Sequence, residues 1–122
     1  MSRSTVESYF AAINADRFGD LAAVFAPQVE IHTVGAAVVA GRDAAIAHFP
    51  AVLAGYATHD DQVTRWIEAP DAIVCEIRFV GSLRDGRPVT FDALDVFDLH
   101  DSAITKITTW YDTRAVARQV RS

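Results

Sequence analysis

The segment from residue 72 to residue 112 constrains the fold of this chain more than any other. Its sequence, AIVCEIRFVGSLRDGRPVTFDALDVFDLHDSAITKITTWYD, alternates apolar and polar residues in runs separated by turn residues. This pattern is typical of three consecutive antiparallel strands. Asp85 and Gly86 favour a two-residue turn, because both central positions of such a turn need a positive φ angle. The turn would fix the pairing register of the first two strands.

With that register, Glu76 lies directly opposite Asp95, and Arg78 lies on the diagonal between them. Like charges directly opposite each other destabilise a sheet. A pair of carboxylates on this face therefore indicates a shared proton, a cation between them, or a ligand. Four apolar side chains are expected around these charges on the same face: Val74, Val80, Phe91 and Phe97.

A turn of two or four residues within residues 100–103 places the third strand on the same face, so that Asp95 faces Thr108 and Asp112 joins the acidic face. The other face of the sheet is also apolar. A second copy of the chain is the simplest cover for it, so we expect a homodimer. The residues expected on this second face are Ile73, Cys75, Ile77, Phe79, Leu94 and Val96.

The first half of the chain predicts mainly helices. Ser4 and Glu7 have the spacing of a capping box, and an apolar stripe with helical spacing follows in Val6, Tyr9, Phe10 and Ile13. The other elements are expected as a short helix at residues 20–25, a strand at 29–34, a helix from residue 42 with a bend at Pro50, a strand at 62–68 and a terminal helix at 113–120. Asp60, Asp61 and Arg65 are expected in solvent.

This order of elements predicts one α+β domain over residues 1–122. We expect a cone-shaped, curved antiparallel sheet that wraps around the N-terminal helices and encloses a pocket. The 122 residues are 51% hydrophobic, which is enough for a core with a pocket beside it.

The charge and cysteine content exclude several classes of protein. A formal net charge of −5 argues against nucleic acid or an anionic membrane as a partner. The single cysteine, Cys75, excludes a disulfide framework, and the four histidines lack metal-ligand spacing, so no metal is expected. No leader pattern or apolar span of membrane length is visible, which favours a cytoplasmic protein.

Three segments resemble the nuclear transport factor 2-like superfamily, which includes ketosteroid isomerases, limonene epoxide hydrolases and SnoaL-like polyketide cyclases. They are YFAAINADRFGDLAAVFAPQVEIHTVG, VAGRDAAIAHF and the final DVFDL with ITTWYD. The resemblance covers nearly the whole chain and implies the cone-shaped α+β fold. It implies no single activity, because the superfamily places several activities on one scaffold.

The resemblance assigns expected roles to individual residues. Tyr9 falls where ketosteroid isomerases have their oxyanion-hole tyrosine, and Asp95 falls where they have a protonated aspartic acid beside it. Thr33 or His32 takes the place of their general base. Against limonene epoxide hydrolases, Asp112 matches the aspartate that protonates the epoxide or positions water. Glu76 and Arg78 take the places of that family's arginine and second aspartate, with the charges interchanged.

The residues and the resemblance together predict a cofactor-independent acid–base enzyme that acts on a small hydrophobic molecule by isomerisation, cyclisation or epoxide opening. A non-catalytic dimeric module that binds a small molecule is the alternative. The expected catalytic residues are Tyr9, Glu76, Arg78, Asp95 and Asp112. The expected substrate-binding residues are Phe25, Thr33, Phe91, Phe97 and Trp110.

Overall fold

A computed structural model describes residues 2–121 of the chain. The helices are α1 (Ser2–Asn14), the 3-10 helix η1 (Phe18–Ala23), α2 (Arg42–Leu53) and α3 (Thr113–Arg121). The strands are β1 (Phe25–Thr33), β2 (Val39–Ala40), β3 (Tyr56–Glu68), β4 (Ala72–Leu83), β5 (Pro88–His100) and β6 (Ala103–Tyr111). Within residues 2–121, no helix is both long enough and apolar enough to cross a membrane.

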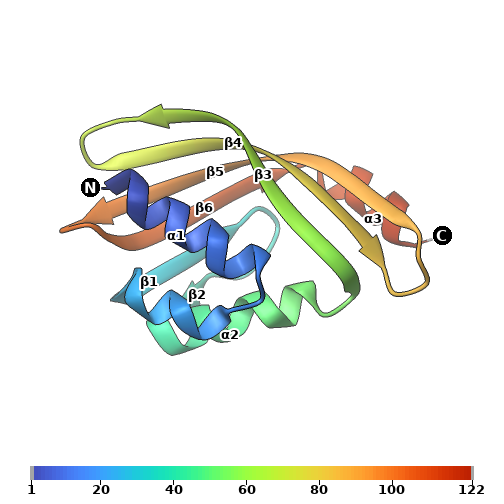
Figure 1. The fold of residues 1–122 in the computed structure, drawn as a ribbon, viewed down its shortest axis with the longest axis horizontal. Helices are drawn as coiled ribbons and strands as arrows, with labels where there is room; N and C mark the ends of the chain where they lie inside the picture. Colours follow the sequence, from blue (N-terminus) through green and yellow to red (C-terminus); the bar gives the residue numbers. More distant parts are fainter. Residues whose placement is uncertain (1, 122) are drawn as a thin grey trace.

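One six-stranded sheet, in the order β2-β1-β6-β5-β4-β3, arches over α1 and α2 (Figure 1). The prediction of an α+β fold with a curved sheet over the N-terminal helices is confirmed. The sheet is not wholly antiparallel as predicted, because β1 pairs with β6 in parallel. This pairing is possible because β1 and β6 are far apart in the sequence, and a parallel pair needs a long connection.

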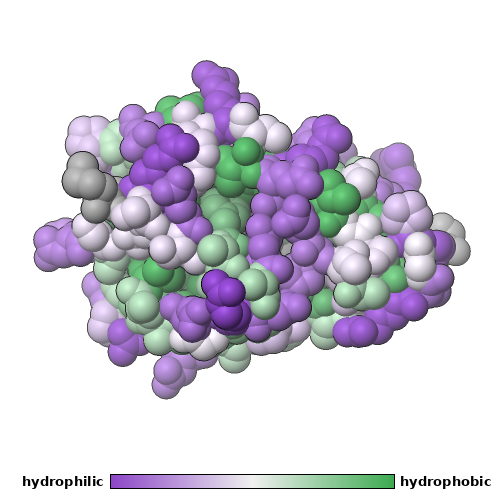
Figure 2. All heavy atoms as spheres, viewed as in Figure 1, coloured by the Kyte–Doolittle hydropathy of each residue, from purple (hydrophilic) through white to green (hydrophobic). Residues whose placement is uncertain are grey.

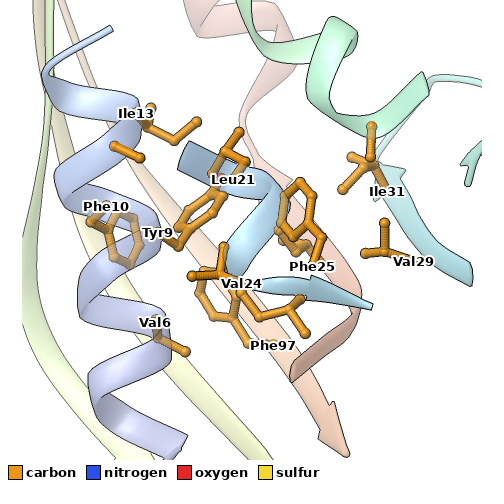
Figure 3. Packing of buried hydrophobic residues seen from close by; sticks show 14 of the residues in the cluster. Val6, Tyr9, Phe10, Ile13, Leu21, Val24, Phe25, Val29, Ile31 and Phe97 are labelled. Carbon is orange, nitrogen blue, oxygen red and sulfur yellow. The ribbon is translucent and has the colours of Figure 1, made fainter. Parts of the chain in front are cut away.

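The core lies between α1 and the concave face of the sheet. The predicted stripe of α1 is buried: Val6, Tyr9, Phe10 and Ile13 are at most 6% exposed. Figure 3 shows these side chains on the side of α1 that faces Phe97 and the η1–β1 segment. On the face of the molecule seen in Figure 2, apolar residues are interspersed with hydrophilic ones.

The loop between β4 and β5 contains three residues, Arg84 to Gly86, instead of the predicted two. Leu83 N–H donates to the carbonyl of Arg87 at 2.8 Å, and Gly86 N–H donates to the carbonyl of Leu83 at 2.9 Å. Gly86 has φ +91°, so the loop is a type I turn followed by a left-handed residue. The extra residue shifts the pairing register by one position.

The predicted opposition of Glu76 and Asp95 is therefore wrong. Glu76 pairs with Leu94, and Asp95 pairs with Cys75. Because side chains alternate along a strand, a shift of one residue moves Glu76 and Asp95 to opposite faces of the sheet. The predicted second face is also corrected for β4, whose apolar residues Ile73, Cys75, Ile77 and Phe79 are buried on the inner face.

The turn between β5 and β6 has two residues, Asp101 and Ser102, with φ +50° and +63°. This length agrees with the prediction. An irregularity after Asp98 nevertheless shifts the register between the two strands, so that Asp95 pairs with Thr109 and not with Thr108. A β-bulge has this effect because it opposes two residues of one strand to one of the other.

Gly81 allows β3 and β4 to approach closely. A Cβ atom at this position would lie 2.6 Å from the carbonyl oxygen of Thr58 and 2.9 Å from the ring of Phe79. We expect Gly81→Ala to lower the free energy of unfolding by about 1–3 kcal/mol. Gly55→Ala is the control, because a Cβ atom there meets nothing within 4 Å. Urea unfolding of both variants checks the prediction, which equal stabilities would contradict.

Candidate functional site

A cavity of about 320 Å³ lies on the concave side of the sheet. Side chains from α1, α2, α3 and all the strands except β2 line it. Its polar and titratable members are Tyr9, Thr33, His48, Tyr56, Asp61, Asp95, Thr109 and Tyr111. Its apolar members are Ile13, Ala36, Phe49, Val52, Leu53, Ile77, Phe91, Ala93 and Val116.

Asp95 is the buried carboxylic acid of this cavity. It is 6% exposed, and Thr109 Oγ1 donates a hydrogen bond of 2.6 Å to its Oδ1 atom. Burial raises the pKa of Asp95 to about 7, the Thr109 hydrogen bond opposes this rise, and the charge of Asp61 adds to it. At neutral pH the Asp95 carboxyl group is therefore in part protonated, and in that form it can donate a hydrogen bond.

Asp61 is the second carboxyl group of the cavity, and the prediction that it lies in solvent is wrong. Burial raises its pKa to about 6, opposed by His59 and reinforced by Asp60. β3 begins at Tyr56, earlier than predicted. Val63 packs against the core, and side chains two residues apart on a strand share one face. The sequence signal for the position of Asp61 is therefore its spacing of two residues from Val63, which continues to His59.

Asn14 fixes the backbone of Asp61 from the last turn of α1. Asn14 Nδ2 donates to the carbonyl of Asp61 at 3.0 Å, and Asp61 N–H donates to Asn14 Oδ1 at 2.9 Å. β3 is the last strand of the sheet, so these backbone groups have no neighbouring strand on that side. The same helix carries Tyr9, so α1 sets the positions of both Tyr9 and Asp61.

Tyr9 directs its hydroxyl group into the cavity. The side chain is 3% exposed and lines the cavity, and within residues 2–121 no hydrogen bond satisfies its hydroxyl. No fully buried side-chain oxygen or nitrogen in that range lacks a partner, so this hydroxyl must reach the open space of the cavity. Burial, then the charges of Asp95 and Asp61, raise the pKa of Tyr9. Tyr9 therefore stays protonated and is available as a donor.

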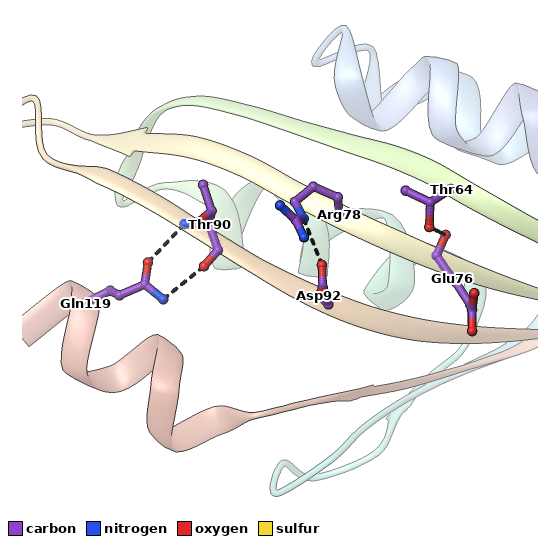
Figure 4. Close-up of polar contacts among 6 residues, drawn as sticks. All are labelled: Thr64, Glu76, Arg78, Thr90, Asp92 and Gln119. Atoms are coloured by element: carbon purple, nitrogen blue, oxygen red, sulfur yellow. Dashed lines mark hydrogen bonds and ion pairs between the residues drawn. The ribbon is translucent and has the colours of Figure 1, made fainter.

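Glu76 and Arg78 do not lie in this cavity, contrary to the prediction. They lie on the outer face of the sheet, where Arg78 Nε donates to Asp92 Oδ1 at 2.8 Å and Thr64 bonds the backbone of Glu76 (Figure 4). Arg65 is the ion-pair partner of the Glu76 carboxylate, at 3.8 Å. The three-residue loop before β5 is the physical reason, since it reverses the faces that the two strands share.

Asp112 and Trp110 also lie outside the cavity lining. Asp112 follows β6 and accepts a hydrogen bond of 2.9 Å from Ala115 N–H, which caps the N-terminus of α3. Trp110 is 53% exposed on the outer face, and its neighbour Tyr111 points into the cavity instead. The bulge in the β5–β6 pairing is the reason, because it moves every later residue of β6 by one position.

The other expected substrate-binding residues divide into two pairs. Thr33 and Phe91 line the cavity. Phe25 and Phe97 belong to the core, at 3% and 0% exposed, where their rings pack around Tyr9 at centroid distances of 6.2 and 5.1 Å. His32, the alternative residue at the base position, points away from Thr33 and bonds Glu30 at 2.8 Å.

Neither a metal cluster nor a reactive thiol is visible in the described part of the chain. Within residues 2–121, no three His, Cys, Asp or Glu side chains are grouped to hold a metal ion. Cys75 is buried, and burial raises the pKa of its thiol to about 12. The titratable side chains of the cavity lining are the carboxyl groups of Asp61 and Asp95, the imidazole of His48 and the phenols of Tyr9, Tyr56 and Tyr111.

Residues 6–107 match the model of the SnoaL-like domain, and the chain belongs to that family. No curated protein matches the sequence. A protein assigned as a SnoaL-like polyketide cyclase from Jannaschia sp. CCS1 superposes with a TM-score of 0.90 at 17% identity, over 99% of this chain and 92% of that one.

Two further solved structures share the fold. A protein with a ketosteroid isomerase-like fold from Catenulispora acidiphila DSM 44928, in complex with trimethylamine, has a TM-score of 0.88 at 17% identity, covering 98% of this chain and 94% of its own. An LEH-like epoxide hydrolase from M. tuberculosis has a TM-score of 0.82 at 17% identity, covering 96% and 86%. At these identities the likeness establishes the fold, and the site must be argued from its own residues.

The raised pKa of Asp95 has a consequence for stability. The unfolded chain releases this proton near pH 3.8 and the folded chain near pH 7, so the folded state binds the proton more tightly. The resulting stability is fully present below about pH 4 and is lost as the pH rises to about 7. Above pH 7 the folded protein therefore holds a destabilising buried charge.

We expect Asp95→Asn to raise the free energy of unfolding at pH 8 by roughly 1–3 kcal/mol, because the amide keeps the shape without the charge. At pH 4 the variant and the natural protein should differ much less. Asp101→Asn in the β5–β6 turn is the control, since the Asp101 side chain is 90% exposed. Urea unfolding at pH 4, 6 and 8 measures the effect, and a less stable Asp95→Asn at pH 8 would contradict it.

Proposed function

We propose that this SnoaL-like protein is a cofactor-independent acid–base enzyme that moves a proton on a small, largely apolar carbonyl compound. The observation that carries the proposal is the convergence of Tyr9, Asp61 and Asp95 on one cavity with apolar walls. Two carboxyl groups with different pKa values, about 6 and about 7, can divide the roles of base and acid at neutral pH.

The three side chains have distinct roles in this proposal. Asp61, which is less buried than Asp95 and feels the charge of His59, is the ionised carboxylate and removes a proton from the carbon next to the carbonyl group. The electron pair of that C–H bond forms a carbon–carbon double bond, the π pair of the carbonyl group moves onto the oxygen, and an enolate results. Tyr9 and the protonated form of Asp95 donate hydrogen bonds to this oxygen as its charge develops. Where a second double bond is conjugated with the enolate, return of the proton from Asp61 to the far end of that double bond gives isomerisation. Where the substrate carries a second carbonyl group, attack of the enolate on its carbon gives cyclisation, and the alkoxide that forms takes the proton from Asp61.

The charges around the cavity favour these reactions over epoxide opening. The resemblance to limonene epoxide hydrolases implies a water-activating relay with an arginine between two carboxylates, and Arg78 instead pairs with Asp92 on the outer face. Among residues 2–121, no arginine or lysine lines the cavity. The neighbour assigned as a polyketide cyclase is in keeping with a proton-transfer reaction on the same scaffold.

The test is exchange of the hydrogens next to the carbonyl group of cyclohexanone and α-tetralone for solvent deuterium, followed by NMR. We expect exchange above the buffer rate, a decrease of about 10²–10⁴-fold in Asp61→Asn, and a decrease of about 10–10³-fold in Tyr9→Phe. Glu76→Gln should exchange at the natural rate, because its side chain lies on the outer face. No exchange above buffer with either ketone would contradict the proposal and favour the non-catalytic binding module.

We also propose a homodimer through the outer face of the sheet. Trp110 at 53% and Val80 at 38% exposed are apolar there, with Leu94 beside Trp110 in a shallow depression. The charges of Arg78 and Asp92 in the same area have opposite signs, which suits a symmetric contact.

We expect Trp110→Glu to shift the mass measured by light scattering from two chains to one. Asp101→Asn, in the β5–β6 turn, is the control, and a natural protein that is monomeric at all concentrations overturns the proposal.

A further inference from the structure

The lining of the cavity is acidic, and the charge of His59 acts on Asp61 from outside the lining. Asp61 and Asp95 both line it, and among residues 2–121 no lysine or arginine does. His48 is the histidine in the lining, and burial lowers its pKa, so its ring is neutral at pH 7. The lining therefore offers up to two negative charges to a ligand and repels a carboxylate or a phosphate.

Aromatic rings form the less buried part of the lining. Tyr56, Phe91 and Tyr111 line the cavity, and all three are only partly buried. The ring centroids of Phe91 and Tyr111 are 5.4 Å apart, and Phe79 joins Phe91 to Tyr56 at 4.7 and 5.0 Å. Faces of aromatic rings attract an ammonium group through their quadrupole, and this attraction is stronger where water is excluded.

The Tyr9 hydroxyl, a polar group with no partner, lies in the more buried part of the cavity. The hydroxyl of Tyr9 lines the cavity, its side chain is 3% exposed, and within residues 2–121 it makes no hydrogen bond. A buried phenol normally has a partner. The cavity thus places a donor for an oxygen atom in the buried part and aromatic rings in the more exposed part, within about 320 Å³.

We propose that the carbonyl compound of this site is a small amine that is positively charged at neutral pH and is apolar apart from its ammonium group and its oxygen. Its ammonium group lies against Tyr56, Phe91 and Tyr111 in the negative potential of the two carboxyl groups, and its oxygen accepts from Tyr9. The proposal rests on the proposed function for the role of the oxygen and adds the chemical class of the ligand. The positive charge would also stabilise an enolate in a cavity whose lining supplies no cation of its own.

This proposal predicts how binding depends on pH. A bound cation favours the ionised forms of Asp61 and Asp95, whose pKa values are about 6 and about 7 in the empty cavity. When both carboxyl groups are ionised, Tyr9 is the donor to the substrate oxygen, and Asp95 joins it only in its protonated form. Binding is therefore strongest above pH 7 and weakens as the pH falls through both values. The other titratable groups near these carboxyls are Tyr9, His48, His59, Asp60, Cys75 and, nearer the rings, Tyr56 and Tyr111.

The test compares choline with its uncharged carbon analogue, 3,3-dimethylbutan-1-ol. The two molecules have the same shape and hydroxyl group, and they differ in the positive charge. We expect choline to shift the NMR signals of Tyr56, Phe91 and Tyr111 and to bind at least about tenfold more tightly than the analogue at pH 8. The difference should shrink at pH 5. Equal or tighter binding of the analogue, or no binding of choline in the cavity, overturns the proposal.

Two variants separate this proposal from the proposed function. Asp61→Asn should weaken choline binding at pH 8 severalfold and leave the analogue unchanged. Asp60→Asn is the matched control, because Asp60 is exposed and bonds Gln62, and it should change choline binding less than twofold. Equal effects of the two variants contradict the proposal. Deuterium exchange of neutral ketones that depends on Asp61, without any preference for choline, would retain the proposed function and reject the amine.

Discussion

The pairing register of β4 with β5 determines which acidic side chains face the cavity. The loop from Arg84 to Gly86 sets that register through two backbone hydrogen bonds, and one residue more or less would exchange the inner and outer faces. As built, the loop turns Asp95 inward and Glu76 outward. The bulge after Asp98 then brings Thr109 opposite Asp95. The three-residue loop thus sets the face of Asp95, and the bulge supplies its hydrogen-bond partner.

Burial of two carboxyl groups is unfavourable, and the fold compensates for it only in part. Thr109 gives Asp95 one hydrogen bond, and Asn14 holds the backbone of Asp61 without neutralising its side chain. The remaining penalty is visible as raised pKa values. Stability given up at a cavity is typical of a functional site. The charged pairs on the outer face are exposed, so screening by water makes their contribution to stability small.

The sequence predicts the individual helices and strands of this fold well. It predicts poorly which side chains of neighbouring strands share a face. The stripe of α1 and the alternation in β1 were recognisable because each depends on a single period. Asp85-Gly86 leaves the length of its loop ambiguous, because the pair suits a two-residue turn and also a three-residue loop in which a type I turn is followed by glycine. Asp61 was missed because the first half of β3 is polar. Tyr9 and Asp95 were identified by resemblance, and the structure places both at one cavity.

The most direct test of this account is the NMR titration of the side-chain carboxyl carbons of Asp61 and Asp95 in the natural protein. We expect midpoints near pH 6 and near pH 7, with each transition perturbed by the other because the groups interact. Midpoints near pH 4 for both groups would show that water reaches them freely. In that case the cavity would hold two ordinary carboxylates, and the division into acid and base would be wrong.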